Sequence, residues 1–458
     1  MNAPITLSAG FEGRPSRAVG VSLPGQALFW AFQSAVLVAL ACTSFFPILF
    51  RYQEHAVIIL FVLCLGMCWA ERSSPWIRTP LDVPIAVFVL WVLATVPFAT
   101  DPAYSFAEWK KFVAQVLVYY WSLLVLHRRR RRELPQQVLS SLVAGAAALS
   151  SYAIIEFLAR GGTWRDRFIR AHAFGSDYNW LSTYMVMTIP VVAGLVAVAA
   201  RGRWRAVQAG ALVLTGAAQL FSYTRGGWLG HAAQGVMAAL MVGGRRLLLG
   251  VLGAIVLVGA GLVVASQVGL QKDTVDSTTV GTRLAVWSIG LREVAASPLV
   301  GIGYGNNSFV KKFPQYSLEN QAGIPERERV IPAMHSTFLM VALGSGLPAL
   351  AGLLWIFGAL LRRLLPVPWV PATSDRRTWL AVAIGLAVLG FGVRNCFDYM
   401  FMGSLAHVFW LLAAVGVTLT NPTWHDLVAG RDGEIRTESN RRPDTSGTGH
   451  AGVRTTTA

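Results

Sequence analysis

Long apolar blocks, separated by short polar links, recur along most of the 458-residue chain. Most blocks are about 17–25 residues long, the length that carries an α-helix across the hydrocarbon core of a bilayer. Since lipid cannot satisfy unpaired backbone groups, and no strand-like alternation points to a barrel, the pattern predicts an all-α polytopic integral membrane protein. It predicts twelve spans, at residues 27–50, 55–70, 82–98, 112–126, 136–158, 178–199, 206–222, 227–242, 247–266, 337–361, 378–395 and 403–420.

One long polar segment divides these spans. It separates the ninth span from the tenth and is the only loop large enough to fold into a cap with helices of its own. The last residues are small and polar, which predicts a disordered tail. The predicted organisation is a polar segment over 1–26, nine spans over 27–266, the large loop over 267–336, three spans over 337–420, and the tail over 421–458.

Composition and charge agree with a membrane protein. Of all residues 54% are hydrophobic and 14% are charged, and the mean hydropathy is +0.51. The net charge is +16, with many arginines in the short links, as in "HRRRRRE" at 127–133. This distribution follows the positive-inside rule and argues against nucleic-acid binding. With both termini placed in the cytoplasm, the loops at about 159–177 and 267–336 fall outside, where functional residues are expected.

Several arginines oppose this orientation because they fall on the outer side. A charge at a helix mouth is costly unless something pairs with it, and a guanidinium fork can bind two phosphate oxygens at once. A missing anionic partner, a phosphate, is therefore expected on this side. The arginines concerned are Arg160, Arg165, Arg167, Arg170, Arg225 and Arg283.

These arginines differ in how well a simpler explanation fits. Arg165 and Arg167 flank an aspartate and are also explained as solvated side chains, and Arg160 is explained as a snorkelling one. Arg170 stands in a segment that leads straight into a helix. Arg225 has no acidic neighbour in sequence, and two glycines follow it, so that a bulky head group can approach the backbone.

The large loop has a readable pattern of its own. Thr282 can cap a helix that starts near Arg283, and Pro298 ends it. The turn-rich "GIGYGNN" that follows is not a nucleotide loop, because no Gly-Lys-Ser/Thr follows it. The expected helix would lie on the protein or the membrane surface with one apolar face, formed by Leu284, Trp287, Leu291 and Val294.

His335 directly precedes the tenth predicted span, at the N-terminus of a helix. The positive end of the helix dipole favours the neutral, basic imidazole and also attracts anions. A neutral base beside an anion site suits transfer to a hydroxyl acceptor, because the base removes the proton and the anion site stabilises a phosphate leaving group. A purely structural histidine at a membrane interface is the alternative.

Three stretches together resemble the O-antigen ligase and O-antigen polymerase superfamily. They are "SYTRGGWLG" from Ser222, "GTRLAVWSIGLREVAASPLVGIGYGNNSF" from Gly281, and "MHSTFLMVALGSGLPAL" from Met334. The detailed match covers about 222–350, and the topology matches over the whole chain. The resemblance implies a glycan transferase that takes its donor glycan from undecaprenyl pyrophosphate in the periplasmic leaflet of the bacterial inner membrane.

The resemblance also implies roles for individual residues. Arg225 and Arg283 would hold the pyrophosphate, with Arg170 as a further substrate-binding candidate, and His335 would activate the acceptor hydroxyl. Asp398 is a substrate-binding candidate because the family has an acidic position near its last spans, although Asp398 at i, i+4 from Arg394 most simply pairs with it.

No metal or other cofactor is expected. The donor arrives activated, so ATP is not needed, and "KDTVD" is a poor metal site because its two aspartates stand three apart in a flexible run. Cys64 and Cys68 share a helix face without a histidine or carboxylate near them, which favours small buried hydrophobes. Arginines would then neutralise the charge that a metal ion often neutralises.

The acceptor separates the possible functions. A ligase would use a sugar hydroxyl of lipid A–core, a polymerase another carrier-linked repeat unit, and a protein O-oligosaccharyltransferase a serine or threonine. The ligase is preferred on overall layout. A transporter of polyprenyl-linked glycan belongs to another class, and it would show charges buried in mid-span and related halves, which the sequence does not show.

Overall fold

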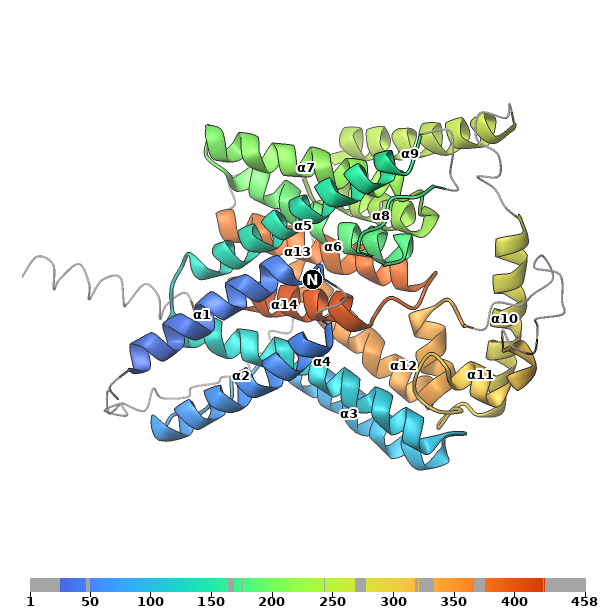
Figure 1. The fold of residues 1–458 in the computed structure, drawn as a ribbon, viewed down its shortest axis with the longest axis horizontal. Coiled ribbons are helices and arrows are strands. Elements are labelled where there is room, and N and C mark those ends of the chain that lie inside the picture. The colour runs from blue at the N-terminus through green and yellow to red at the C-terminus, as the bar shows by residue number, and fades with distance from the viewer. Residues whose placement is uncertain are drawn as a thin grey trace, which may run out of the picture.

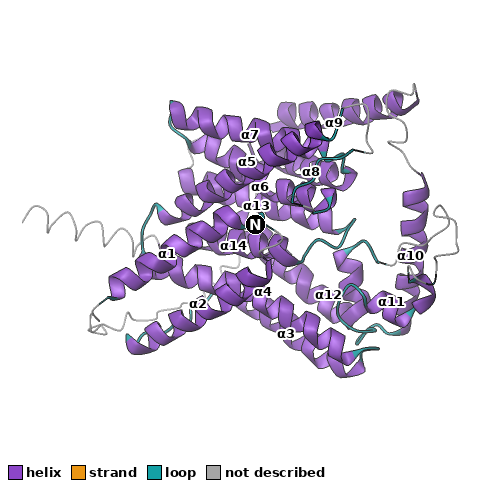
Figure 2. Cartoon of the chain, in the orientation of Figure 1, coloured by secondary structure: helices purple, strands orange, loops and turns teal. Residues whose placement is uncertain are grey.

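The computed structural model describes residues 25–46, 50–163, 169–174, 176–242, 244–267, 277–317, 320, 333–365, 375–422 and 424. Within these ranges the chain forms helices and loops and no strand (Figure 2). The predicted polar segment at 1–26 and the predicted disordered tail lie almost wholly outside the described residues. Both therefore stay predictions.

Twelve of the helices correspond one to one to the twelve apolar blocks. They pack into one bundle in which the helices fan out, so that α3 and α12 are inclined to α1 and α2 (Figure 1). They are α1 (Gln26–Thr43), α2 (Phe50–Ala70), α3 (Asp82–Thr95), α4 (Pro102–Arg129), α5 (Leu134–Ala159), α6 (Tyr178–Val198), α7 (Arg203–Phe221), α8 (Arg225–Val242), α9 (Gly244–Gln267), α12 (Thr337–Leu364), α13 (Arg376–Asn395) and α14 (Gly403–Leu419).

Three predicted boundaries are wrong by more than a turn, one of them the start of α2, which lies at Phe50 and not at residue 55. The first helix ends at Thr43 rather than near residue 50, and Pro47 follows in the sequence, where a helix cannot easily continue. The fourth helix begins ten residues before the predicted start at 112. Its first turns carry charged residues that hide the start, but the Asp101 carboxylate accepts a hydrogen bond from the Tyr104 N–H at 2.9 Å and caps the helix.

Six helices are long and apolar enough to cross a membrane by length and composition: α1, α2, α5, α6, α12 and α13. Helix α14 and α3 with the 3₁₀ turn after it (Val96–Phe98) are apolar but shorter, as is the stretch Arg246–Leu257 of α9. The chain is thus a multi-pass membrane protein by its apolar helices. A total of twelve spans remains a prediction, because the other helices carry charges in their first turns, as α4 and α7 do.

The surface of the bundle is apolar where lipid would contact it. Large hydrophobic side chains on several helices point outward, and Trp69, Leu90 and Val213 are exposed by 85%, 63% and 72%. In water such a surface would cause aggregation, whereas lipid tails solvate it.

Helix ends that were predicted on one side of the membrane contact one another. We call the end of the bundle where α4, α6, α8 and α12 begin the loop end. The opposite end is the one where α5, α7 and α13 begin. Hydrogen bonds join segments within the loop end, from Ala171 to Phe221, Thr100 to Ile302 and Thr337 to Asp398. Other hydrogen bonds join segments at the opposite end, from Arg128 to Ser74, Arg363 to Thr420 and Trp424 to Leu126.

Helix α12 is broken where the glycine-rich segment of the large loop meets it. Ser345 and Gly346 have non-helical backbone angles, and the freed carbonyls of Leu343 and Gly344 accept hydrogen bonds from Ile302 N–H and Gly303 N–H at 2.9 and 2.8 Å. These N–H groups therefore bind a helix and not a phosphate. A Cβ on Gly301 would lie 2.4 Å from the Leu343 carbonyl oxygen, so that only glycine fits.

Two further helices, the 20-residue α10 (Ser277–Ala296) and the short α11 (Ser308–Lys312), lie outside the bundle proper. Figure 1 shows α10 standing across the loop end rather than along the bundle. It begins earlier than predicted, so Thr282 lies inside the helix and is not its cap. The sequence holds cap-type residues further upstream, at Asp276 and Ser277, which compete with Thr282 for that role.

The buried face of α10 also differs from the predicted one. Val286 and Val294 are buried and Trp287 is partly buried, whereas Leu284 and Leu291 are exposed by 57% and 58%. The four apolar residues thus face two directions. Those on the inner side hold α10 on the protein, and the two leucines are free to contact a membrane surface.

Candidate active site

His335 and Asp398 form a direct pair at the loop end of the bundle. Ser336 caps α12 by accepting a hydrogen bond from Leu339 N–H, and His335 stands just before this cap. Its backbone has a φ of +44°, a left-handed conformation that is uncommon for a non-glycine residue and costs of order 1 kcal/mol. In this position the Nδ1 atom of His335 lies 3.0 Å from Oδ1 of Asp398.

The second ring nitrogen of His335 is the chemically interesting one. Nε2 is buried and makes no hydrogen bond to any described residue. Because the carboxylate accepts the proton of Nδ1, the neutral ring carries its lone pair on Nε2. The side chain as a whole is 22% exposed, but Nε2 is covered, so neighbouring side chains must shift before a substrate hydroxyl can reach this atom.

Arg394 holds the other oxygen of Asp398. Its Nη2 lies 3.1 Å from Oδ2 of Asp398, which confirms the pairing expected from their i, i+4 spacing. The same Nη2 donates to Oδ1 of Asn179, at 3.0 Å, on the first turn of α6. Arg394 is only 1% exposed. An arginine this deeply buried and doubly bonded serves to position the carboxylate and is not available to bind substrate.

The charge state of Asp398 follows from these contacts. Burial by itself would raise the pKa of this carboxyl, but the hydrogen bond from His335 and the positive charge of Arg394 outweigh it, so the pKa lies below its ordinary value. Asp398 is therefore ionised at neutral pH. It can stabilise a positive charge on the imidazole next to it.

Arg225 begins α8 beside the cluster that His335, Asp398 and Arg394 form. The next residue, Gly226, is packed so closely on Arg394 that an added Cβ would lie 2.9 Å from Nη1. The glycine that was expected to let a bulky head group approach the backbone therefore lies against Arg394. The Arg225 side chain itself is exposed. The structure thus brings Arg225 to the same end of the bundle as His335.

Arg283 reaches the cluster from α10. Its positive charge acts on both Asp398 and Arg394, which places it near them, and its Nε is buried with no hydrogen-bond partner among the described residues. Helix α10 is fixed to the segment before His335, because the indole of Trp287 donates to the Met334 carbonyl at 2.6 Å. An added Cβ on Gly290 would lie 2.2 Å from the Met334 side chain.

The remaining outer arginines divide into three cases. Arg170 stacks its guanidinium over the ring of Tyr178, 4.2 Å from the centroid, and Tyr178 directly precedes Asn179 at the start of α6. Arg160 pairs with Glu156 and contacts His172 at the end of α5. The predicted candidates Arg165 and Arg167 lie outside the described residues.

Sequence reasoning missed Asn179 as a partner of this cluster. Its amide bonds Arg394 across 215 positions of the chain, and a lone asparagine at a helix start reads as a capping residue. Its position in the stretch that carries Arg170 was the available signal.

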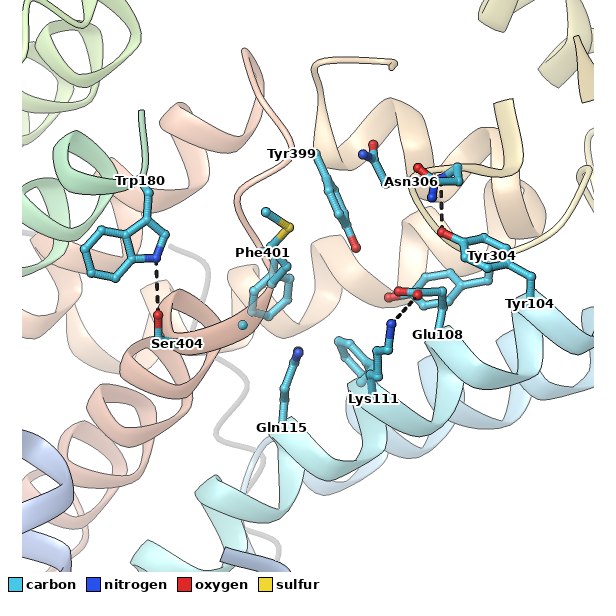
Figure 3. A pocket seen from close by; sticks show the side chains of 14 residues that line it. Tyr104, Glu108, Lys111, Gln115, Trp180, Tyr304, Asn306, Tyr399, Phe401 and Ser404 are labelled. Carbon is cyan, nitrogen blue, oxygen red and sulfur yellow. Dashed lines mark hydrogen bonds and ion pairs between the residues drawn. The ribbon is translucent and has the colours of Figure 1, made fainter. Parts of the chain in front are cut away.

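A cavity of about 410 Å³ adjoins the cluster (Figure 3). Two of its lining residues are chain neighbours of the cluster: Tyr399 follows Asp398, and Trp180 follows Asn179. Other walls come from α4, the glycine-rich segment and the start of α14. Among the described residues no group of three or more histidine, cysteine or carboxylate side chains could hold a metal ion.

Comparison with known proteins finds a similarity to one protein family. Residues 210–354 match the family model of O-antigen ligase, a stretch that contains Arg225, Arg283 and His335. Among curated proteins none matches the chain. Members of the family are glycosyl-transfer enzymes, both ligases and polymerases. Residues 210–354 are thus similar to the O-antigen ligase family, which confirms the resemblance seen in the three sequence motifs.

Proposed function

We propose that the chain is a ligase that moves O-antigen polysaccharide from undecaprenyl pyrophosphate to a sugar hydroxyl of lipid A–core, at the periplasmic face of the bacterial inner membrane. The observation that carries this proposal is the His335–Asp398 pair, with an unpartnered Nε2, at the end of the bundle where Arg225 and Arg283 lie. The family domain supports the same class of reaction.

In the proposed reaction His335 acts as the general base. Nε2 takes the proton from the acceptor hydroxyl while that oxygen bonds the anomeric carbon of the donor sugar. The bond from this carbon to the phosphate oxygen breaks, and undecaprenyl pyrophosphate leaves with the electron pair. Asp398 stabilises the imidazolium that forms and holds the ring in place, so it positions the base and need not touch the substrate.

The arginines take the role of stabilising the leaving group. Arg225 and Arg283 bind the diphosphate oxygens, and Arg170 lies at the neighbouring helix start, where it can contact the same group. Guanidinium forks suit this task because they bind two oxygens at once and stay charged at all relevant pH values. Arg394 remains bonded to Asp398 and does not bind the diphosphate. Because the donor is already activated, the proposed reaction needs no ATP, and because arginines neutralise the leaving diphosphate, it needs no metal ion.

Reconstitution tests the proposal and its alternatives together. The purified chain in lipid nanodiscs is incubated with undecaprenyl-pyrophosphate glycan and one of three acceptors: lipid A–core, a second carrier-linked repeat, or a serine-rich protein. Product on lipid A–core supports the ligase, and product on the other two identifies a polymerase or a protein-directed transferase. Movement of the donor across a bilayer without a new bond would identify a transporter and overturn the transfer reaction.

A further inference from the structure

The cavity next to the His335–Asp398 pair is lined by aromatic and polar side chains of the kinds that suit a carbohydrate. We propose that it is a subsite for an uncharged, hydroxyl-bearing sugar ring next to the reacting centre, with Glu108, Asn306 and Tyr399 as the residues that recognise it. The inference rests on the proposed function, because it assigns this ring to one of the two glycans that meet at His335.

Size and wall chemistry support a sugar ligand. The cavity measures about 410 Å³, within the range of about 300–1,000 Å³ typical of small-molecule sites. Figure 3 shows aromatic rings on several sides, with Tyr399 reaching in between Phe401 and Asn306. Aromatic faces give apolar contact area to the C–H faces of a sugar, and tyrosine and tryptophan add a polar edge.

Polar groups of both kinds converge on the same space. The side-chain oxygen of Asn306 is buried without a hydrogen-bond partner among the described residues. The Tyr104 hydroxyl accepts a hydrogen bond from Asn307 N–H, which leaves its own proton to donate. Burial raises the pKa of Tyr399, so that its hydroxyl also stays protonated and can donate. Sugar hydroxyls donate and accept at once, and they need such a mixed set of partners.

The cavity differs in charge from the place where Arg225 and Arg283 lie. Its lining holds one carboxylate and one ammonium, Glu108 and Lys111, which pair at 2.6 Å. The cavity therefore has no excess of positive charge and offers little attraction to a diphosphate. A diphosphate prefers the arginines, which leaves this space for a neutral part of the substrate.

The position of the cavity links its occupant to the chemistry. Tyr399 and Asp398 are consecutive residues, and the Tyr399 N–H donates to the Asp398 carboxylate at 3.2 Å. On the other wall Trp180 is consecutive with Asn179, the partner of Arg394. A sugar held here lies against the two segments that position the base.

The test uses the full chain and two lipid-free probes. One is the core oligosaccharide and the other the O-chain oligosaccharide, both released by mild acid from the lipopolysaccharide of the producing strain. Binding is measured by saturation-transfer NMR, and transfer by KM for donor and acceptor separately. The variants are Glu108→Gln and Tyr399→Phe, which remove a charge or a hydroxyl and leave the packing intact.

A matched control comes from the second glutamate–lysine pair at the loop end. Glu293 lies 3.9 Å from Lys312 and is 22% exposed, against 18% for Glu108, but it does not line the cavity. Glu293→Gln therefore removes the same charge outside the proposed subsite. We expect Glu108→Gln to weaken one probe by about 10-fold and to raise the KM of the matching substrate alone, since a hydrogen bond to a charged group contributes that much. The Glu293→Gln protein should behave as wild type.

The outcomes separate the two proposals. If Glu108→Gln weakens binding of the core probe, the ring belongs to the acceptor. If it weakens binding of the O-chain probe, the ring belongs to the donor. If transfer proceeds and Glu108→Gln and Tyr399→Phe match wild type with both probes, the subsite is wrong and the transferase stands. If no transfer occurs but a probe binds and Glu108→Gln weakens it, the sugar site stands without the reaction. If neither binding nor transfer is seen, both proposals fall.

Discussion

The Nδ1 atom of His335 lies 3.0 Å from the carboxylate of Asp398, although 63 positions separate them in the chain. The contact is made by two loop-end segments, one entering α12 and one leaving α13, and the Thr337 N–H donates to the Asp398 carbonyl at 3.2 Å beside it. His335, the carboxylate that bonds its ring and the buried Arg394 that holds this carboxylate thus form one chain of contacts. Such an arrangement is the basis for the first two predictions.

Replacing Asp398 by asparagine should slow transfer far more than it weakens donor binding. The amide can no longer stabilise the imidazolium, and it can turn the ring to the wrong tautomer, so kcat should fall by about 10²–10⁴-fold. Single-turnover kinetics in nanodiscs measure this step. Asp101→Asn is the control, because asparagine also caps a helix and Asp101 lies away from the cluster. If His335→Ala and Asp398→Asn multiply their effects in the double variant, the two residues do not act as a unit.

Removing Arg394 should destabilise the protein through Asp398. Arg394→Met would leave a buried carboxylate with one partner fewer, and breaking a buried pair in this way costs about 3–5 kcal/mol. Thermal unfolding in detergent measures the loss. The double variant Arg394→Met/Asp398→Asn removes the stranded charge, so it should recover part of the stability. A double variant less stable than Arg394→Met alone would show that the ion pair is not the cause.

Hydropathy and local spacing predicted what depends on neighbours in the sequence. The twelve apolar blocks each contain a helix because burial in lipid needs only length and apolar composition. The pairing of Arg394 with Asp398 was predicted because both stand within one helical turn. The start of α4 was missed because its first turns carry charged residues, two of which, Glu108 and Lys111, line a cavity that no hydropathy pattern reveals.

Relations between distant segments could not be predicted in the same way. The sequence suggested that Arg225, Arg283 and His335 share a side of the membrane, but it did not pair His335 with Asp398 or Arg394 with Asn179. Nor did it show that Gly226 packs closely on Arg394. Each of these contacts depends on how three or four helices pack together, and this packing is not encoded in any one of them.

The pH dependence of stability should reveal the carboxylate of the cluster. Because the pKa of Asp398 is lowered in the folded protein, its contribution is fully present above the unfolded value, about 3.9, and is lost as the pH falls through the lower folded value. The difference in unfolding temperature between wild type and Asp398→Asn should thus be constant from about pH 7 to 5 and shrink below about pH 4. Parallel curves over the whole range would contradict this assignment.

Chelation should leave transfer unchanged. In the proposed mechanism the guanidinium groups of Arg225 and Arg283 neutralise the leaving diphosphate, a task that metal ions perform in many phosphoryl and glycosyl transferases. Transfer is measured with and without excess EDTA, next to a magnesium-dependent glycosyltransferase that shows the chelator to be effective. Loss of activity that a divalent ion restores would mean that the arginines do not suffice.

Arg225 and Arg283 should each contribute to donor binding, whereas a neighbouring arginine should not. Arg225→Ala and Arg283→Ala should each weaken binding of undecaprenyl pyrophosphate by about 10-fold or more, since hydrogen bonds to charged groups contribute about 1.5–3 kcal/mol. Lysine in their place should recover only part of the affinity because it lacks the planar fork. Native mass spectrometry with the carrier lipid measures the effect. Arg160→Ala is the matched control, because that arginine is also at the loop end but pairs with Glu156. If all three alanine variants bind the carrier alike, the diphosphate is not held by Arg225 and Arg283, and general positive charge at this end explains the affinity.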